Sequence, residues 1–481
     1  MTSTASGVRS VFVFVVAGHL SMIGLAILIS ESRAAGLPAG DIVVTADITS
    51  GDPGLMLIDP TTGNRTILSD NTHGTGMPFT YPNDVSVMSN GQLLVADGGT
   101  PYQSADTPVP VPDSVSTNSL PPATPARLYI VDPTTGNRTV ISQDSLTTSS
   151  PVYSEIGSGP AFGAAGYARQ VGNQILVSAA NNNGDLNLAG RLMTVDPATG
   201  NRAIFSNFNV GTGPAPEWMG GMVASGNSLF APGYFQGLFK IDLATGNRIL
   251  LSGANAGAGP AFTVGYSAAA YGGQIYVSGA GQSSNAATYG VFRIDPVTGN
   301  RSVVSSSTVG NGPLDTTGTM QLAIGSAGTI LMTVQGHNAN GLLTIDPLTG
   351  NRALLSDATH GAGPAFEAMN GVTVIPLYGD ANGDGIVNTQ DLATIASQWS
   401  HNGYFLQGDL NNDGIVNAQD LALASSNWLG TSLGHGDLAN ANTMAPVPEP
   451  ATVLLSLVAG AALAVARLRS KLISSRVRSP L

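Results

Sequence analysis

Short apolar runs alternate with turns rich in glycine, proline and asparagine between residues 41 and 376. A seven-residue turn, Asp-x-x-Thr-Gly-Asn-Arg, separates two such runs in six places, beginning at Asp59, Asp132, Asp196, Asp242, Asp295 and Asp346. Proline after the aspartate presets φ for a turn, and the glycine can adopt the positive φ that closes a tight hairpin. Each turn therefore predicts a hairpin between two antiparallel strands.

Two further strand-like runs usually precede each hairpin, as in "GYSAAAY" at Gly265 followed by "GQIYVSGA" at Gly273. Four short strands that recur at a spacing of roughly 45–75 residues are typical of a β-propeller blade. The six copies predict an all-β, six-bladed β-propeller over residues 41–376.

The two ends of this repeat region complement each other. The first copy starts with "DIVVTAD" at Asp41 and lacks its first strand, whereas an extra strand-like run, "NGVTVIPLY" at Asn370, follows the last copy. If residues 372–375 pair with residues 42–46, the first blade is completed and no sheet edge is left open. A linear solenoid would need capping repeats instead, so the pattern favours a closed ring.

The repeated turns have a structural and a ligand-binding interpretation. The aspartate and the arginine of each turn lie on either side of it and could pair across it. Alternatively, the arginines could form a ring that binds an anionic polymer; they are Arg65, Arg138, Arg202, Arg248, Arg301 and Arg352. Because the six neighbouring aspartates would cancel much of that field, we favour the structural interpretation.

A second repeated segment, such as "GSGPAF" at Gly157 and "GAGPAF" at Gly361, occupies the crossings from one blade to the next. Glycine allows two backbones to approach closely, and we expect the aromatic residue to wedge between blades. The crossings share a face with three long insertions, at residues 98–126, 179–190 and 278–290. A ligand of the propeller is expected on this irregular face.

Two twelve-residue segments after the ring, "DANGDGIVNTQD" and "DLNNDGIVNAQD", follow the pattern of an EF-hand calcium loop. Acid or amide side chains stand at positions 1, 3, 5, 9 and 12, glycine stands at position 6, and position 7 offers its carbonyl oxygen. Calcium prefers six to eight oxygen ligands. We therefore expect two calcium ions, one bound by Asp380, Asn382, Asp384, Ile386, Asn388 and Asp391, and the other by Asp409, Asn411, Asp413, Ile415, Asn417 and Asp420.

One helix-like segment follows each loop, and each ends in tryptophan: "LATIASQW" at Leu392 and "LALASSNW" at Leu421. A loop and one helix, doubled and without an entering helix, resembles a type I dockerin over residues 378–430. The resemblance implies a small α module that folds with calcium and docks onto a cohesin. Loop positions 10 and 11, Thr389-Gln390 and Ala418-Gln419, depart from the Ser/Thr pair of well-studied dockerins. The alternative is that calcium only folds the module. A linker is expected over residues 431–446.

Both ends of the chain are apolar. Arg9, a long apolar run and Ala34-Ala35-Gly36 predict a signal peptide over residues 1–35, with an uncleaved anchor as the alternative. Val-Pro-Glu-Pro, an apolar helix and a basic tail at residues 447–471 resemble the PEP-CTERM sorting signal. The resemblance implies a transmembrane helix, processing by an exosortase, and delivery to the cell surface or extracellular matrix. A plain C-terminal membrane anchor is the alternative.

Composition excludes several functions. The 481 residues include no cysteine, so disulfides, thiolate catalysis and cysteine-bound metals are excluded. Residues 36–449 carry 11 basic and 29 acidic side chains. Such an acidic body lacks the basic footprint that nucleic acid requires.

The segment "YPNDVSVMSNGQLLVAD" at Tyr81 resembles blades of the NHL and SMP-30/gluconolactonase-like propellers. In such lactonases, carboxylates and amides from several blades bind a metal in the central channel, and only Asn83-Asp84 fits such a position here. An isolated Asn-Asp pair is expected to form a turn instead. The sequence therefore predicts an exported binding or scaffolding protein, with a cohesin and a polysaccharide as expected partners and no assigned catalytic residue. The alternative is a dockerin-tethered carbohydrate-active hydrolase or lactonase.

Overall fold

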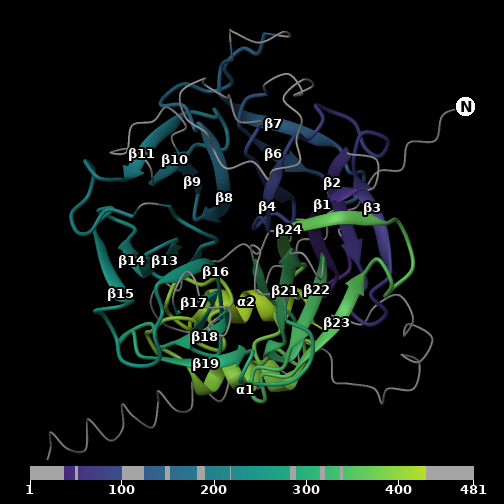
Figure 1. The fold of residues 1–481 in the computed structure, drawn as a ribbon. Helices are drawn as coiled ribbons and strands as arrows, with labels where there is room; N and C mark the ends of the chain where they lie inside the picture. Colours follow the sequence, from purple (N-terminus) through teal and green to yellow (C-terminus); the bar gives the residue numbers. More distant parts are fainter. Residues whose placement is uncertain are drawn as a thin grey trace, which may run out of the picture. The chain divides into compact units, whose positions relative to one another are not determined.

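The computed structural model describes residues 37–48, 52–99, 124–146, 152–180, 190–216, 218–281, 289–314, 320–335 and 340–428. Their strands form six antiparallel sheets of four strands each, arranged as blades around a common centre (Figure 1). The predicted six-bladed β-propeller is confirmed.

The strands alternate with tight turns, as the apolar runs predict, and each blade takes four of them. Blade 1 contains β24 (Phe366–Val374), β1 (Ile42–Ile48), β2 (Asp52–Ile58) and β3 (Arg65–Ser69); blade 2 contains β4 (Pro82–Val87), β5 (Leu93–Asp97), β6 (Arg127–Val131) and β7 (Arg138–Gln143); blade 3 contains β8 (Ala164–Val171), β9 (Gln174–Ala180), β10 (Arg191–Val195) and β11 (Arg202–Ser206). Blade 4 contains β12 (Val223–Ser225), β13 (Ser228–Gly233), β14 (Gly237–Asp242) and β15 (Arg248–Ser252); blade 5 contains β16 (Val264–Tyr271), β17 (Gln274–Ala280), β18 (Gly290–Ile294) and β19 (Arg301–Ser306); blade 6 contains β20 (Leu322–Ile324), β21 (Ile330–Gln335), β22 (Asn340–Ile345) and β23 (Arg352–Asp357).

The ring closes by joining its two ends. Strand β24 pairs antiparallel with β1, with Val374 opposite Ile42 and Val372 opposite Val44. The Gly40 N–H donates to the carbonyl of Ile375 at 2.8 Å, next to this pairing. Blade 1 therefore takes its innermost strand from the far end of the repeat region, as the sequence predicts, although β24 begins earlier than expected.

The core lies between neighbouring blades. One buried cluster joins Leu94 and Leu128 of blade 2 to Ile175 and Val177 of blade 3, and all four side chains are fully buried. Another cluster spans the seam between blade 6 and blade 1. Each fully buried aliphatic side chain contributes about 1.5–3 kcal/mol of transfer free energy, so blade-to-blade burial holds the ring together.

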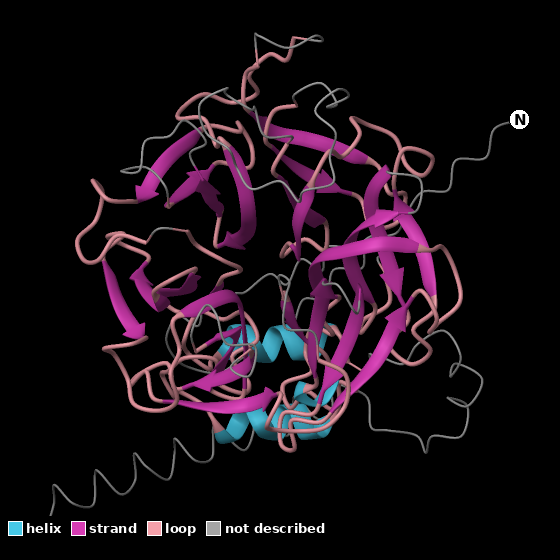
Figure 2. Cartoon of the chain, in the orientation of Figure 1, coloured by secondary structure: helices cyan, strands magenta, loops and turns pink. Residues whose placement is uncertain are grey.

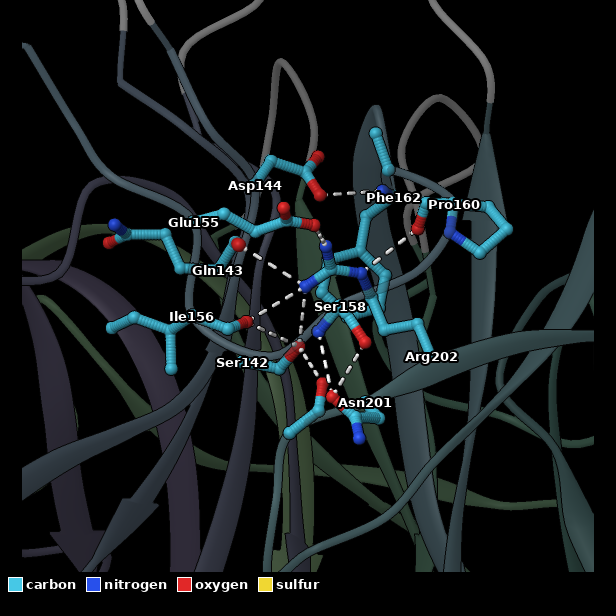
Figure 3. A network of polar contacts seen from close by, with 12 residues as sticks. Ser142, Gln143, Asp144, Glu155, Ile156, Ser158, Pro160, Phe162, Asn201 and Arg202 are labelled. Atoms are coloured by element: carbon cyan, nitrogen blue, oxygen red, sulfur yellow. Dashed lines mark hydrogen bonds and ion pairs between the residues drawn. The ribbon is translucent and has the colours of Figure 1, made fainter.

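The arginine that ends the repeated turn joins each blade to the preceding one, as Arg202 illustrates (Figure 3). Its Nη1 donates to Ser142 Oγ at 2.8 Å and to the carbonyl of Ile156 at 3.0 Å, while Nε donates to the carbonyl of Pro160 at 2.9 Å. The guanidinium also pairs with Glu155. Because β11 belongs to blade 3 and Ser142 to blade 2, these bonds cross the boundary between blades.

The same joint recurs around the ring. The equivalent arginines donate to a serine at the end of the preceding blade's outer strand: Arg138 to Ser69, Arg248 to Ser206, Arg301 to Ser252, Arg352 to Ser305 and, across the seam, Arg65 to Ser356. The turn aspartates instead accept backbone N–H groups within their own turn; Asp196 Oδ1, for example, accepts from Ala198 at 2.8 Å. The expectation that aspartate and arginine pair across the turn is wrong, because the long guanidinium side chain reaches the neighbouring blade.

The crossings between blades complete this joint. The Ser158 N–H donates to Asn201 Oδ1 at 2.8 Å, and the Arg202 N–H donates to the carbonyl of Ser158 at 2.7 Å (Figure 3). Gly159 has a φ of 121°, and a Cβ there would lie 2.1 Å from the carbonyl oxygen of Arg202, so only glycine fits. Phe162 is fully buried beneath the Arg202 guanidinium, 5.0 Å from its ring centre. The predicted aromatic wedge is therefore present here.

Two short helices, α1 (Thr389–Ser397) and α2 (Ala418–Ser426), follow the ring (Figure 2). Leu392, Ile395, Val416 and Ala424 form their small buried core. Among the described residues, no helix is long and apolar enough to cross a membrane. The predicted signal peptide (1–35), linker (431–446) and sorting signal (447–471) lie outside the described residues.

Candidate functional site

The first predicted calcium loop wraps around the carboxylate of Asp380. Its Oδ1 accepts the N–H groups of Gly383 at 2.7 Å and Asp384 at 3.0 Å, and Oδ2 accepts that of Gly385 at 2.8 Å. Gly385 has a φ of 87°, which lets the chain turn sharply at loop position 6. The local sequence therefore folds back on its own first predicted ligand.

The last loop position, Asp391, closes the loop. It is fully buried in the first turn of α1, where Oδ2 accepts the N–H of Asn388 at 2.7 Å and completes a capping box. Its Oδ1 accepts the N–H groups of Ala381 at 2.7 Å and Asn382 at 3.1 Å. One carboxylate thus fixes both the start of the helix and the start of the loop.

The second loop repeats this geometry. Asp409 accepts the N–H groups of Asp413 at 3.1 Å and Gly414 at 2.9 Å, and Asp420 accepts those of Leu410 at 2.7 Å and Asn417 at 2.8 Å. Two independent segments therefore reach the same arrangement.

Direct hydrogen bonds link the remaining predicted ligands. At positions 3 and 5, Asn382 donates to Asp384 at 2.9 Å in the first loop, and Asn411 donates to Asp413 at 3.0 Å in the second. At positions 9 and 7, Asn388 Nδ2 lies 3.5 Å from the Ile386 carbonyl, and Asn417 Nδ2 lies 3.2 Å from the Ile415 carbonyl. The oxygens of the position-9 amides cap the helices, since Asn388 Oδ1 accepts the N–H of Gln390 at 2.7 Å and Asn417 Oδ1 accepts that of Gln419 at 2.8 Å. The twelve predicted residues thus lie in two compact sets of six.

The electrostatics of these sets suit a divalent cation. Burial raises the pKa of Asp409 to about 6, and the nearby carboxylates of Asp420 and Asp413 add to the increase. Burial also raises the pKa of Asp380. None of the ion pairs found among the described residues involves a loop carboxylate. A bound cation would offset this crowding of negative charge.

The donor chemistry fits calcium. The described residues contain no group of three or more His, Cys, Asp or Glu side chains arranged to hold a metal by themselves, so a cation must also use the amide and carbonyl oxygens. A mixed set of carboxylate, amide and carbonyl oxygens is what a hard cation such as Ca²⁺ prefers.

Comparison with protein families decides what this segment is. Residues 378–423 match the family model of the dockerin type I domain. The segment is a dockerin type I domain. Dockerins of this type generally bind calcium, and their presence indicates docking outside the cell. The helix-start positions Thr389, Gln390, Ala418 and Gln419 of this dockerin are exposed.

The propeller has remote structural neighbours. A proposed 6-phosphogluconolactonase from Bacteroides fragilis is 10% identical with a TM-score of 0.40, and the alignment covers 69% of this chain and 97% of that one. A protein of unknown function from Bacteroides caccae is 12% identical with a TM-score of 0.40, covering 70% of this chain and 99% of that one. No curated protein sequence matches the chain.

The sequence predicts that Asn83 and Asp84 form a turn, and this prediction is wrong. Both residues lie in the inner strand β4, where Asn83 donates to the carbonyl of Ala165 at 2.9 Å. Asp84 is buried, accepts the N–H of Ala168 at 3.0 Å and pairs with Arg169. Burial raises the pKa of Asp84, and the Arg169 charge opposes that increase. These contacts link the inner strands of blades 2 and 3.

The six turn arginines do not form an exposed basic ring. Arg65, Arg138, Arg202, Arg248 and Arg352 are buried in the joints between blades, and Arg301 is half-buried. The predicted loop face is described only in part, because most of the three long insertions lies outside the described residues.

Sequence reasoning missed three exposed aromatic residues on the loop face of blade 4. Trp218 lies in the crossing into this blade, and Tyr234 and Phe235 lie in the turn between β13 and β14; their exposed fractions are 46%, 36% and 55%. The Tyr234 N–H donates to the carbonyl of Trp218 at 3.0 Å, and the Tyr234 ring stands edge-on to Phe235 at 4.4 Å. Tyr266 packs beneath Tyr234 at 5.5 Å. We call Trp218, Tyr234 and Phe235 the aromatic platform. Its signal in the sequence was the pair of adjacent aromatic residues in the short turn "APGYFQG".

Proposed function

We propose that this chain is an exported binding or scaffolding protein, in which a calcium-loaded dockerin attaches the propeller to a cohesin-type partner. The match of residues 378–423 to the dockerin type I domain carries this proposal. The apolar segments at residues 1–35 and 447–471 would direct export and exosortase-dependent sorting to the cell surface, with a transient transmembrane helix before processing.

Two calcium ions would bind, one in each loop, through the twelve residues named above. Each ion would provide the positive charge around which the carboxylates and amides fold. Calorimetric titration of the chelator-treated chain with calcium should give two sites. An Asp380→Ala, Asp409→Ala double variant that retained wild-type calcium binding would refute the ligand assignment.

The propeller would bind a polysaccharide on the aromatic platform. Exposed aromatic rings offer flat apolar faces against which the C–H faces of sugar rings stack, and the Tyr234 hydroxyl adds a polar group. The six turn arginines are buried or half-buried in the joints between blades, which favours an uncharged glycan over an anionic polymer.

Retention of the full chain on insoluble polysaccharides tests this ligand. A Trp218→Ala, Phe235→Ala variant should bind about tenfold more weakly, equivalent to about 1.4 kcal/mol. Ile249→Ala, an equally exposed apolar position on β15 of the same blade, should bind normally. Unchanged retention of the platform variant, or steady release of sugar or acid from the polysaccharide, would contradict the proposal.

A further inference from the structure

Backbone carbonyls of the dockerin contact three neighbouring turns of the propeller. These turns join the first and second strands of blades 4, 5 and 6, at residues 225–228, 271–274 and 325–329, and we call them the turn surface. Each turn donates one backbone N–H to a dockerin carbonyl: Gly226 to Asn412 (3.0 Å), Gly273 to Phe405 (2.9 Å) and Ala327 to Gly383. The turn surface lies at the opposite end of the strands from the aromatic platform, because strand direction alternates within each blade.

Two of these carbonyls stand at position 4 of a calcium loop. In the second loop, the Asn412 carbonyl accepts from Gly226, while the N–H of the same peptide unit, on Asp413, donates to Asp409 Oδ1 at 3.1 Å. A single peptide unit thus connects the propeller to the first predicted calcium ligand. Hydrogen bonds in such a chain polarise and strengthen one another.

The first loop makes the same connection with another blade. The Gly383 carbonyl accepts from Ala327 of blade 6, and the N–H of the same peptide unit, on Asp384, donates to Asp380 Oδ1 at 3.0 Å. The preceding peptide repeats the arrangement, since the Asn382 carbonyl accepts from the Tyr271 hydroxyl at 3.3 Å. Both calcium loops therefore use their ligand-binding turn to contact the propeller.

Side-chain packing supports these contacts. The Tyr271 ring lies between Gly328 of blade 6 and Gly383 of the first loop; a Cβ on Gly328 would lie 2.3 Å from the ring, and a Cβ on Gly383 would lie 3.0 Å from its hydroxyl. This close fit requires the loop to hold one conformation.

The segment between the two loops anchors the dockerin at blade 4. Phe405 is 7% exposed, donates its N–H to Ser225 Oγ at 3.1 Å and packs 5.6 Å from the Phe230 ring. Its φ of 52° is rare for a bulky residue and persists only where surrounding contacts enforce it. Lys240 Nζ lies 4.4 Å from the Tyr404 ring centre, within cation–π distance.

We propose that calcium binding by the dockerin is coupled to its contact with the turn surface, so that each strengthens the other. This inference rests on the proposed calcium function. Calcium would fix the turns around Asp380 and Asp409. These turns orient the carbonyls at loop position 4 toward the N–H groups of Ala327 and Gly226. Because coupling between two binding equilibria is reciprocal, the propeller must raise calcium affinity by the factor by which calcium stabilises the contact.

Lys240 offers a direct readout of the contact. It is one of only two lysines in the chain, the other being Lys471, so acetylation at each is resolved by peptide mass analysis. In the full chain with calcium, the Tyr404 ring covers the Lys240 ammonium, and acetylation should be slow. Removing calcium with a chelator should accelerate acetylation of Lys240 severalfold and leave Lys471 unchanged. Equal Lys240 rates with and without calcium, in a chain that binds calcium, would overturn the coupling.

Calcium affinity tests the reciprocal effect. Tyr271→Ala alters only the propeller side, and Phe405→Ala removes a side chain that packs against the propeller rather than in the dockerin core. Each should weaken calcium binding about fivefold or more, the lower end of typical coupling factors, whereas Ile249→Ala should not. Wild-type affinity in both variants would overturn the proposal. A flat titration of the unaltered chain would instead overturn the calcium sites, and with them the coupling.

Discussion

The joint at the ring seam gives the sharpest stability prediction. Arg65 donates to Ser356 Oγ at 2.9 Å and to the carbonyls of Asp357, His360 and Pro364 at 2.8 Å each. Its guanidinium also lies 5.3 Å from the Phe366 ring centre. Arg65→Ala deletes all of these contacts and leaves one buried hydroxyl and three part-buried carbonyls without this donor.

The expected loss of stability follows from the hydrogen-bond acceptors that Arg65→Ala leaves without a donor. An unsatisfied buried acceptor costs about 1–3 kcal/mol, but water can reach some of these carbonyls. We expect a total loss of about 3–5 kcal/mol in the free energy of unfolding, from four such acceptors at about 1 kcal/mol each together with the lost packing of the Arg65 side chain. For a domain of this size, the melting temperature should fall by roughly 4–7 °C.

Differential scanning calorimetry of the ring transition measures this loss. Arg65→Lys keeps the charge but cannot reproduce the forked donors, so it should rescue only part of the stability. Arg293→Ala, at an exposed position on β18, should change the free energy of unfolding by less than about 0.5 kcal/mol. If Arg65→Ala and Arg293→Ala melted at the same temperature, the joint would not hold the seam and our reasoning would be wrong.

Three further predictions concern other parts of the chain. Chelation of calcium should unfold the dockerin while the ring keeps its strand signal in circular dichroism; loss of both together would show that the ring itself requires calcium. Gly63→Ala should destabilise the ring far more than Gly172→Ala in urea unfolding. Both glycines have a positive φ, of 70° and 58°, but only at Gly63 would the added Cβ meet a backbone oxygen, that of Leu355 at 1.9 Å. Gly172→Ala should therefore reduce the free energy of unfolding by only about 1–2 kcal/mol. Turn hydrogen bonds lower the pKa of Asp196, Asp242, Asp295 and Asp346 below 3.8, so their stabilising contribution is present above pH 3.8 and is lost as pH falls through their folded pKa values. Changing all four to asparagine should flatten the stability profile in that acidic range, and an unchanged acid dependence would count against this origin.

The ring was predictable because its hairpin motif repeats along the sequence. Six copies of one hairpin, with one strand missing at the start and one extra at the end, specify both the number of blades and the way they close. The fold of the two loops was predictable for a related reason, since each set of six residues lies within twelve consecutive positions and folds around its own carboxylates. That these residues bind calcium stays a prediction.

Contacts between elements were harder to predict. Arg202 donates to Ser142, which lies 60 residues away in another blade. The sequence of the turn alone does not show whether the guanidinium binds that serine or the aspartate of its own turn. Asp84 was expected in a turn because Asn-Asp pairs favour turns, but burial against Arg169 and the Ala168 N–H holds it in a strand. The aromatic platform combines a crossing with a turn of the same blade, and the backbone bond between Tyr234 and Trp218 forms only once the blade has folded.

The repeated joint gives every boundary between blades the same arginine–serine hydrogen bond, including the seam. Where the chain enters and leaves the ring, the Gly40 N–H and the Ile375 carbonyl are within 2.8 Å of each other, so a short linker could fuse these two points. The ring could then be cut at a different crossing to give a circular permutant. In such a molecule, the dockerin could be attached beside any chosen blade.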